Sequence, residues 1–187
     1  FPTSEGPVGF FVGRLLPYKG LDVLVRAIAG TSLHIVIGGD GPMRPTLEAL
    51  VAQLGVGQQV RLVGNISEDD LPAYHQAADY VVLPSTQPSE MFGMPLLEGM
   101  ACGKPVISTA LPTGVREINE RDVTGLEVPP GDHEALRAAM QRLANDRELR
   151  ARLGAAGRQR VEQNFTADRM LDAHLALCAD LCGKRAS

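Results

Sequence analysis

Short apolar runs alternate with helix-like segments along most of this chain, and this alternation limits the possible folds more than any other feature. The runs carry few polar residues, as do strands that are buried on both faces of a sheet. Segments with helical spacing of apolar residues follow them, and several of these end in glycine. The expected strands are residues 8–14, 33–39, 60–65, 79–85, 105–110 and 124–130, and the expected helices are residues 19–30, 45–55, 67–78, 93–103, 131–165 and 167–182.

This pattern predicts a parallel sheet that is covered by helices on both faces. Right-handed crossovers then give a doubly wound, Rossmann-like α/β domain, in which ligands bind past the carboxyl ends of the strands. The opening segment FPTSEGP has the composition of a linker, and we interpret the chain as half of a longer protein. We therefore expect a linker (1–7), a Rossmann-like domain (8–165) and a C-terminal helical segment (166–187).

Composition argues against several classes of function. The net charge of −4 provides no basic surface field for nucleic acid. No apolar run approaches the roughly 18–20 residues that span a bilayer. The 3 cysteines form no disulfide framework and the 4 histidines are scattered, so we expect no metal site and a reducing compartment, the cytoplasm.

Two cations follow the first expected strand. Arg14 and Lys19 bracket a turn that contains Pro17, and Lys19 is expected at the start of the next helix. A cation at a helix N-terminus opposes the macrodipole, at a cost of about 0.3–1 kcal/mol, unless an anion also binds there. Together with free helix N–H groups, the two side chains therefore favour a phosphate site. Solvated turn residues explain the same pair equally well.

A glycine-rich loop and a narrow loop follow the second and third expected strands. Gly39, within the segment GGDGP, allows close approach of the backbone to a ligand, and a tight turn explains it equally well. The loop with Val63, Asn65 and Ile66 has backbone groups that can face a nucleobase edge, with a plain helix cap as the default interpretation. The fingerprint G-x-G-x-x-G is absent, which argues against an NAD-dependent dehydrogenase.

Two carboxylates flank the start of the helix after the fourth strand, in the segment SEMFGMPLLEGMACGKPV. Gly93 and Met94 begin this helix, so their N–H groups are expected to form a second anion site. Glu98 lies about one and a half turns into the helix, where its carboxylate can accept two hydrogen bonds from a ribose diol. Glu90, on the preceding loop, suits the hydroxyls of a sugar on the distal phosphate. The alternative, that the helix dipole alone favours both acids, explains Glu90 better than Glu98.

Five segments, taken in order along essentially the whole chain, resemble the motifs of a known family. They are VGRLLPYKGLDVLVRA, IVIGGDGP, the E-x-F-G-x-x-x-x-E run from Glu90 to Glu98, GKPVIST and TGLEVPPGD. In this order they resemble the C-terminal half of GT-B glycosyltransferases, in the retaining group called glycosyl transferases group 1, or family 4. Thr113 stands where many relatives have a second glycine, and the N-terminal half of the family's fold is missing.

The resemblance implies the donor-binding domain of a retaining hexosyltransferase that serves polysaccharide biosynthesis. The donor would be a nucleotide-diphosphate sugar of the UDP or GDP type, used without a cofactor or an obligatory metal. A glycan or lipid-linked acceptor would bind the missing N-terminal domain, against which the last helix would pack. The isolated domain would be inactive alone, and the protein would be cytoplasmic, with contact at the inner membrane face as a further option.

The resemblance also assigns roles to residues by motif match. Arg14 and Lys19 would contact the diphosphate and stabilise the departing nucleoside diphosphate, and Glu98 would bind the ribose. Glu90 would lie at the donor sugar, which makes Glu90, Arg14 and Lys19 the expected catalytic residues. The remaining expected contacts are the backbone amides of Phe92, Gly93 and Met94 at the sugar, Gly39, and the segment Val63, Asn65 and Ile66 at the base.

Three alternatives stay open at this stage. A nucleotide-sugar 2-epimerase uses the same two-domain fold, although the two-glutamate run favours the transferase. A lone domain that binds a nucleotide and catalyses nothing is the alternative from another class. The arginine-rich stretch from Arg137 to Arg160 suits either an acidic membrane surface or, because acids are interspersed, a solvated helix face.

Overall fold

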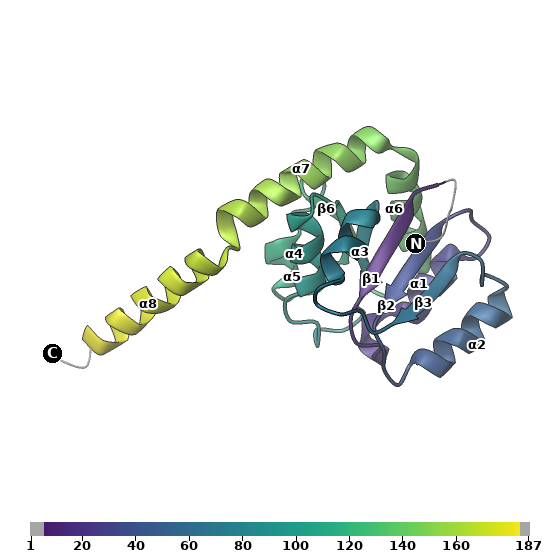
Figure 1. Cartoon of the computed structure of the whole chain (residues 1–187), viewed down its shortest axis with the longest axis horizontal. Helices are drawn as coiled ribbons and strands as arrows, with labels where there is room; N and C mark the ends of the chain where they lie inside the picture. Colours follow the sequence, from purple (N-terminus) through teal and green to yellow (C-terminus); the bar gives the residue numbers. More distant parts are fainter. Residues whose placement is uncertain (1–5, 184–187) are drawn as a thin grey trace.

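Six strands form one parallel sheet with the order β3-β2-β1-β4-β5-β6 in the computed structural model of the chain (Figure 1). The structure describes residues 6–183. The strand order reverses between β1 and β4, which creates a topological switch point at their carboxyl ends. The predicted doubly wound, Rossmann-like α/β fold is therefore confirmed. The strands are Val8–Val12 (β1), His34–Gly38 (β2), Val60–Gly64 (β3), Tyr80–Leu83 (β4), Val106–Thr109 (β5) and Gly125–Val128 (β6).

The helices follow the expected alternation but differ at their ends. The expected helix from residue 19 begins later, because Lys19 ends a short 3-10 helix and Gly20, in the left-handed conformation, precedes α1. The expected helix from Ser67 begins at Leu71, after a turn in which Ser67 Oγ accepts from the N–H of Asp70. The elements are η1 (Pro17–Lys19), α1 (Leu21–Ile28), α2 (Arg44–Leu54), α3 (Leu71–Ala77), α4 (Met94–Ala101), α5 (Val115–Ile118), α6 (His133–Asn145), α7 (Arg147–Asn164) and α8 (Ala167–Gly183).

The arginine-rich stretch forms two helices rather than one. Asp146 leaves the helical conformation, with φ −119° and ψ 94°, and so ends α6. Its carboxylate then accepts a hydrogen bond of 2.8 Å from the N–H of Leu149 and caps α7. The sequence contained this N-cap signal, an aspartate inside an otherwise helical pattern.

The core lies on both faces of the sheet. Phe10 and Phe11 are adjacent in β1, and because side chains alternate along a strand they point to opposite faces. Both are fully buried: Phe11 belongs to the larger cluster, which includes α1 and α2 residues, and Phe10 to a smaller one packed against α3. Burial on both faces explains why the strands carry so few polar residues.

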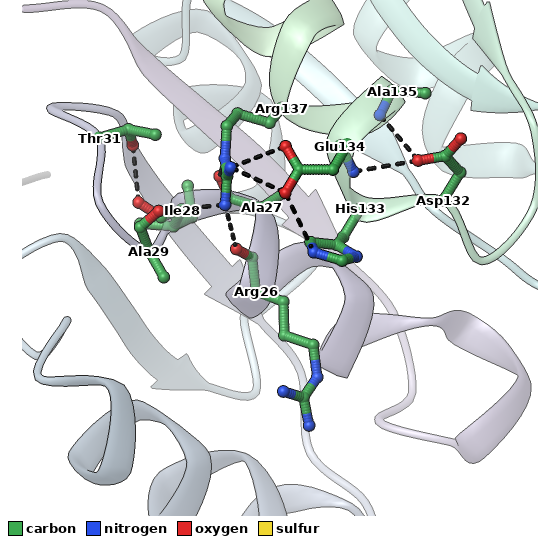
Figure 2. Close-up of polar contacts among 10 residues, drawn as sticks. All are labelled: Arg26, Ala27, Ile28, Ala29, Thr31, Asp132, His133, Glu134, Ala135 and Arg137. Atoms are coloured by element: carbon green, nitrogen blue, oxygen red, sulfur yellow. Dashed lines mark hydrogen bonds and ion pairs between the residues drawn. The ribbon is translucent and has the colours of Figure 1, made fainter.

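Arg137 of α6 binds the C-terminal end of α1 (Figure 2). Its Nη2 donates to the carbonyls of Arg26 and Ala29, both at 3.1 Å, and its Nε to that of Ala27 at 3.0 Å. Its Nη1 donates to both carboxylate oxygens of Glu134, at 3.0 and 2.7 Å. The last carbonyls of a helix lack partners within the helix and carry the negative end of its dipole. One guanidinium therefore joins two helices.

Two further arginines of this stretch act in the same way. Arg150 donates to the carbonyls of Leu143 and Ala144 at the end of α6. Arg160 donates to the carbonyls of Glu117, at 2.7 Å, and Ile118, at 3.1 Å, at the end of α5. Both interactions serve the fold, so these side chains are more than a solvated helix face. Contact of this stretch with a membrane surface stays a prediction.

The last helix, α8, extends outward from α7 and away from the sheet (Figure 1). Its large apolar side chains are 55% to 62% exposed, and they are Met170, Leu171, Leu175, Leu177 and Leu181. Residues 1–5 of the expected linker and residues 184–187 of the expected C-terminal segment lie outside the described residues. Over residues 6–183, no helix has the length and apolar character needed to cross a bilayer.

Candidate functional site

The segments after β1 and β4 meet at the carboxyl edge of the sheet, where the strand order reverses. Gly20 has a φ of 66°, and a Cβ atom built on it would lie 2.1 Å from the carbonyl oxygen of Pro84. The N–H of Thr86 donates to the carbonyl of Tyr18 at 2.7 Å. Only glycine combines this conformation with this approach, so Gly20 lets the two segments lie against each other.

A buried ion pair results from this meeting. Lys19 Nζ lies 2.6 Å from Glu90 Oε2, and the two residues are only 8% and 6% exposed. Ser85 Oγ donates to the same carboxylate oxygen at 2.8 Å. The carbonyl of Ser85 in turn accepts from Thr109 Oγ1, at 2.6 Å, at the end of β5. Two residues expected in the site, 71 positions apart, are thus in direct contact.

This geometry corrects the sequence interpretation of Lys19 and of Glu90. Lys19 does not stand at the start of α1, because it is the last residue of η1 and Gly20 separates it from that helix. The argument from the helix dipole therefore does not hold for Lys19. It is not a solvated turn residue either, because its ammonium group is buried against Glu90. Likewise, the burial of Glu90 excludes its interpretation as a surface residue that the dipole of α4 alone favours.

The start of α4 follows β4 closely, as expected. Gly93 is its N-cap, with a φ of 88°, and no side chain caps the helix. The first N–H groups therefore lack partners within the helix and can bind an anion. Phe92 and Met94 are exposed beside them. The N–H of Gly114 donates to the carbonyl of Met91 at 2.9 Å, so the segment after β5 supports this loop.

Glu98 lies further along α4 and contacts α3. Its side chain is 35% exposed, and its Oε2 lies 3.3 Å from Nε2 of His75, which is 1% exposed. The contact therefore joins α3, which precedes β4, to α4, which follows it. The carboxylate is thus open on one side and held by a buried imidazole on the other.

Arg14 and Gly39 lie at the ends of the two neighbouring strands β1 and β2. Arg14 is exposed and has no ion pair within the described part of the chain. Gly39 has a φ of 113°, and a Cβ atom on it would lie 2.0 Å from the carbonyl oxygen of Gly13. The close backbone approach at Gly39 is therefore to another loop of the chain.

The segment expected at the base is partly used for packing. Val63 and Ile66 pack against the smaller core cluster, and Ile66 also lies against Gly38. Asn65 is exposed between them. Their backbone groups and the Asn65 side chain therefore remain as the parts of this segment that can face a ligand.

Sequence reasoning missed two polar residues that contact the two glutamates, Ser85 at Glu90 and His75 at Glu98. Ser85 was included in the fourth expected strand, although it follows the last strand residue, Leu83, by two positions. His75 was grouped with the scattered histidines. A signal for Ser85 was available, because polar residues just past a strand end are candidates in this fold. Nothing local marked His75, since its partner Glu98 lies 23 positions away. Among residues 6–183 there is no group of three or more His, Cys, Asp or Glu side chains able to hold a metal ion.

Residues 2–160 match the family described as Glycosyl transferases group 1. The chain belongs to this family. The match ends within α7, so that α8 lies outside it. The resemblance of the five sequence segments is thereby confirmed at the level of the family.

Named relatives and solved structures agree with this assignment. The chain is 39% identical over 171 residues to O-antigen chain mannosyltransferase C of Escherichia coli, a match of 91% of this chain and 46% of the relative. It is 40% identical over 163 residues to D-rhamnosyltransferase WbpZ of Pseudomonas aeruginosa, and this match covers 87% of this chain and 42% of the relative. The chain thus spans less than half the length of these curated relatives. The crystal structure of Alr3699/HepE from Anabaena in complex with UDP matches with a TM-score of 0.84 and 26% identity, over 92% of this chain and 49% of that one.

Proposed function

We propose that this chain is the donor-binding half of a retaining glycosyltransferase that uses a nucleotide-diphosphate sugar. The observation that carries the proposal is the arrangement at the switch point. There, Arg14, the Lys19–Glu90 pair, the uncapped start of α4 and Glu98 lie on segments that follow β1 or β4. Membership of the family supports it, as does HepE, which has been solved with UDP and with UDP-glucose.

In this proposal the diphosphate binds between Arg14, Lys19 and the start of α4. Lys19 has three N–H donors, so it can keep its bond to Glu90 and still donate to a phosphate oxygen. The first N–H groups of α4, near Gly93, add donors and the positive end of the helix dipole. When the bond to the sugar breaks, negative charge develops on the departing diphosphate, and the same groups stabilise it. No metal is required for this step in the proposal.

Glu98 accepts hydrogen bonds from the ribose hydroxyls, and Glu90 lies at the donor sugar in the proposal. The backbone amides of Phe92, Gly93 and Met94 border the sugar, and the segment from Val63 to Ile66 borders the base. The buried contacts of Glu90 with Lys19 and Ser85 both end on Oε2, which fixes the orientation of the carboxylate. The sugar, the base and the exact acceptor depend on loop shapes and on the half outside this chain.

The acceptor binds to an N-terminal half in this proposal, and α8 packs against that half. The exposed apolar residues of α8 support the second point. A groove of about 580 Å³ also lies between the first turn of α8 and Phe92 and Met94 at the start of α4. A relative named for an O-antigen chain supports a glycan or lipid-linked acceptor.

Calorimetric titration of the chain with UDP, GDP and ADP, with and without EDTA, tests the proposal. We expect saturable binding of one nucleotide that EDTA does not change, and the base then indicates the class of donor. Binding that EDTA abolishes would contradict the metal-independent mechanism. Absence of binding by all three, in this chain and in the same chain joined to its N-terminal half, would overturn the proposal. A donor hydrolysis assay with and without that half separates a catalytic domain from a nucleotide-binding module.

Replacement of Arg14 tests the diphosphate site directly. Arg14→Ala should weaken binding of UDP by about 1–3 kcal/mol, because a charged hydrogen bond to phosphate is lost, and leave binding of uridine unchanged. The matched control is Arg147→Ala, an exposed arginine beside Pro105 at the amino end of β5. Equal losses for nucleotide and nucleoside would show that Arg14 does not contact the diphosphate. If GDP or ADP binds instead, the corresponding nucleoside is used.

A further inference from the structure

His75 is a buried histidine that, within residues 6–183, makes its polar contact with Glu98. It lies on α3, is 1% exposed, and its Nε2 faces Glu98 Oε2 at 3.3 Å. The ring of Phe10 in β1 packs edge to face against it, with centroids 5.1 Å apart. The other ring nitrogen, Nδ1, is buried and has no hydrogen-bond partner among the described residues. The side chain is therefore locked by packing and directs one nitrogen at one carboxylate.

These surroundings favour a ring proton on Nε2 over one on Nδ1. A proton on Nδ1 would be buried without an acceptor, which is costly, whereas a proton on Nε2 is shared with a carboxylate. A proton on Nε2 lies between the ring and the carboxylate, so His75 donates to Glu98. Glu98 itself is only partly buried, and its side chain would otherwise sample several rotamers.

We propose that His75 is a positioning residue for Glu98, which it holds ready to accept the two ribose hydroxyls of the nucleotide. The inference rests on the proposed function, because it requires that Glu98 binds the ribose. His75 does not touch the ligand. It keeps the carboxylate in one orientation before binding, so that less side-chain freedom is lost when the nucleotide binds.

A comparison of UDP with its 2′,3′-dideoxy analogue isolates this role, with the guanosine or adenosine pair used if that base binds. In the unaltered chain UDP should bind more tightly than the analogue, because only UDP offers hydroxyls to Glu98. His75→Phe removes the donor but keeps a buried ring. This substitution should weaken the binding of UDP about three- to tenfold and leave the binding of the analogue unchanged. His75→Gln places an amide donor near the same position and should restore most of the preference.

Controls separate this inference from a structural effect and from the proposed function. Gln76→Ala, an exposed neighbour on α3, should change neither affinity. The role of His75 would be overturned if His75→Phe weakened the binding of UDP and of the analogue equally. It would also be overturned if the variant kept the full preference for UDP over the analogue. If the unaltered chain and Glu98→Ala both bind the two ligands equally, the ribose assignment itself fails. If none of the three nucleotides binds, the proposed function fails first and the inference with it. Thermal unfolding of each variant shows whether it is folded at the titration temperature.

Discussion

At the scale of single residues, Gly20 controls how closely the segments after β1 and β4 approach. Gly20→Ala should lower the free energy of unfolding by about 2–4 kcal/mol, because alanine meets both a positive φ and the Pro84 carbonyl. Gly30→Ala is the matched control. Gly30 has a φ of 74°, but a Cβ atom built on it would have no neighbour within 4 Å, so Gly30→Ala should lower the free energy of unfolding by only about 1 kcal/mol. Urea unfolding followed by circular dichroism measures both, and similar losses would contradict the close approach at Gly20.

The Lys19–Glu90 pair gives a second prediction at this scale. Lys19→Met and Glu90→Gln should each destabilise the chain by about 3–5 kcal/mol, because each leaves one buried charge without its partner. The double variant should lose less free energy of unfolding than the two single variants together, since it contains neither charge. Chemical unfolding of the three variants gives the coupling energy. Additive losses would mean that the two groups do not interact in solution.

At the scale of elements, Arg137 adds a polar link to the packing of α1 against α6. Arg137→Ala should lower the free energy of unfolding by about 1–3 kcal/mol, because it leaves the last carbonyls of α1 without these donors. Arg26→Ala is the control, since its exposed side chain points away from the cluster (Figure 2). Urea unfolding midpoints compare the two variants. A loss of the same size at Arg26 would assign the effect to general charge rather than to helix capping.

At the scale of the whole molecule, α8 extends from the body of the domain with its large apolar side chains exposed (Figure 1). Truncation after Thr166 should leave the free energy of unfolding within about 0.5 kcal/mol of the original, because the large apolar side chains of α8 are mostly exposed. The full chain should also associate more than the truncated chain at high concentration, since truncation removes exposed apolar side chains. Thermal unfolding and light scattering measure the two effects. A large loss of stability would show that α8 packs on this domain in solution.

Sequence by itself determined the architecture of this protein. Apolar runs without polar alternation required strands buried on both faces, and the helical segments between them required parallel crossovers. The same reasoning placed Arg14 past a strand end, Gly93 at a helix start and Glu98 within that helix, because such positions follow from local patterns. The sequence also contained the cap at Asp146, although the stretch was predicted as one helix.

Only the tertiary structure decided which side chains meet. Lys19 and Glu90 are 71 positions apart, His75 and Glu98 are 23 apart, and Arg137 reaches carbonyls 108 to 111 positions away. Periodicity reports on burial and on near neighbours along the chain, but it carries no information on which distant residues come into contact. Those contacts depend on how the loops at the switch point pack, and that packing turned a lysine expected at a helix start into the buried partner of a glutamate.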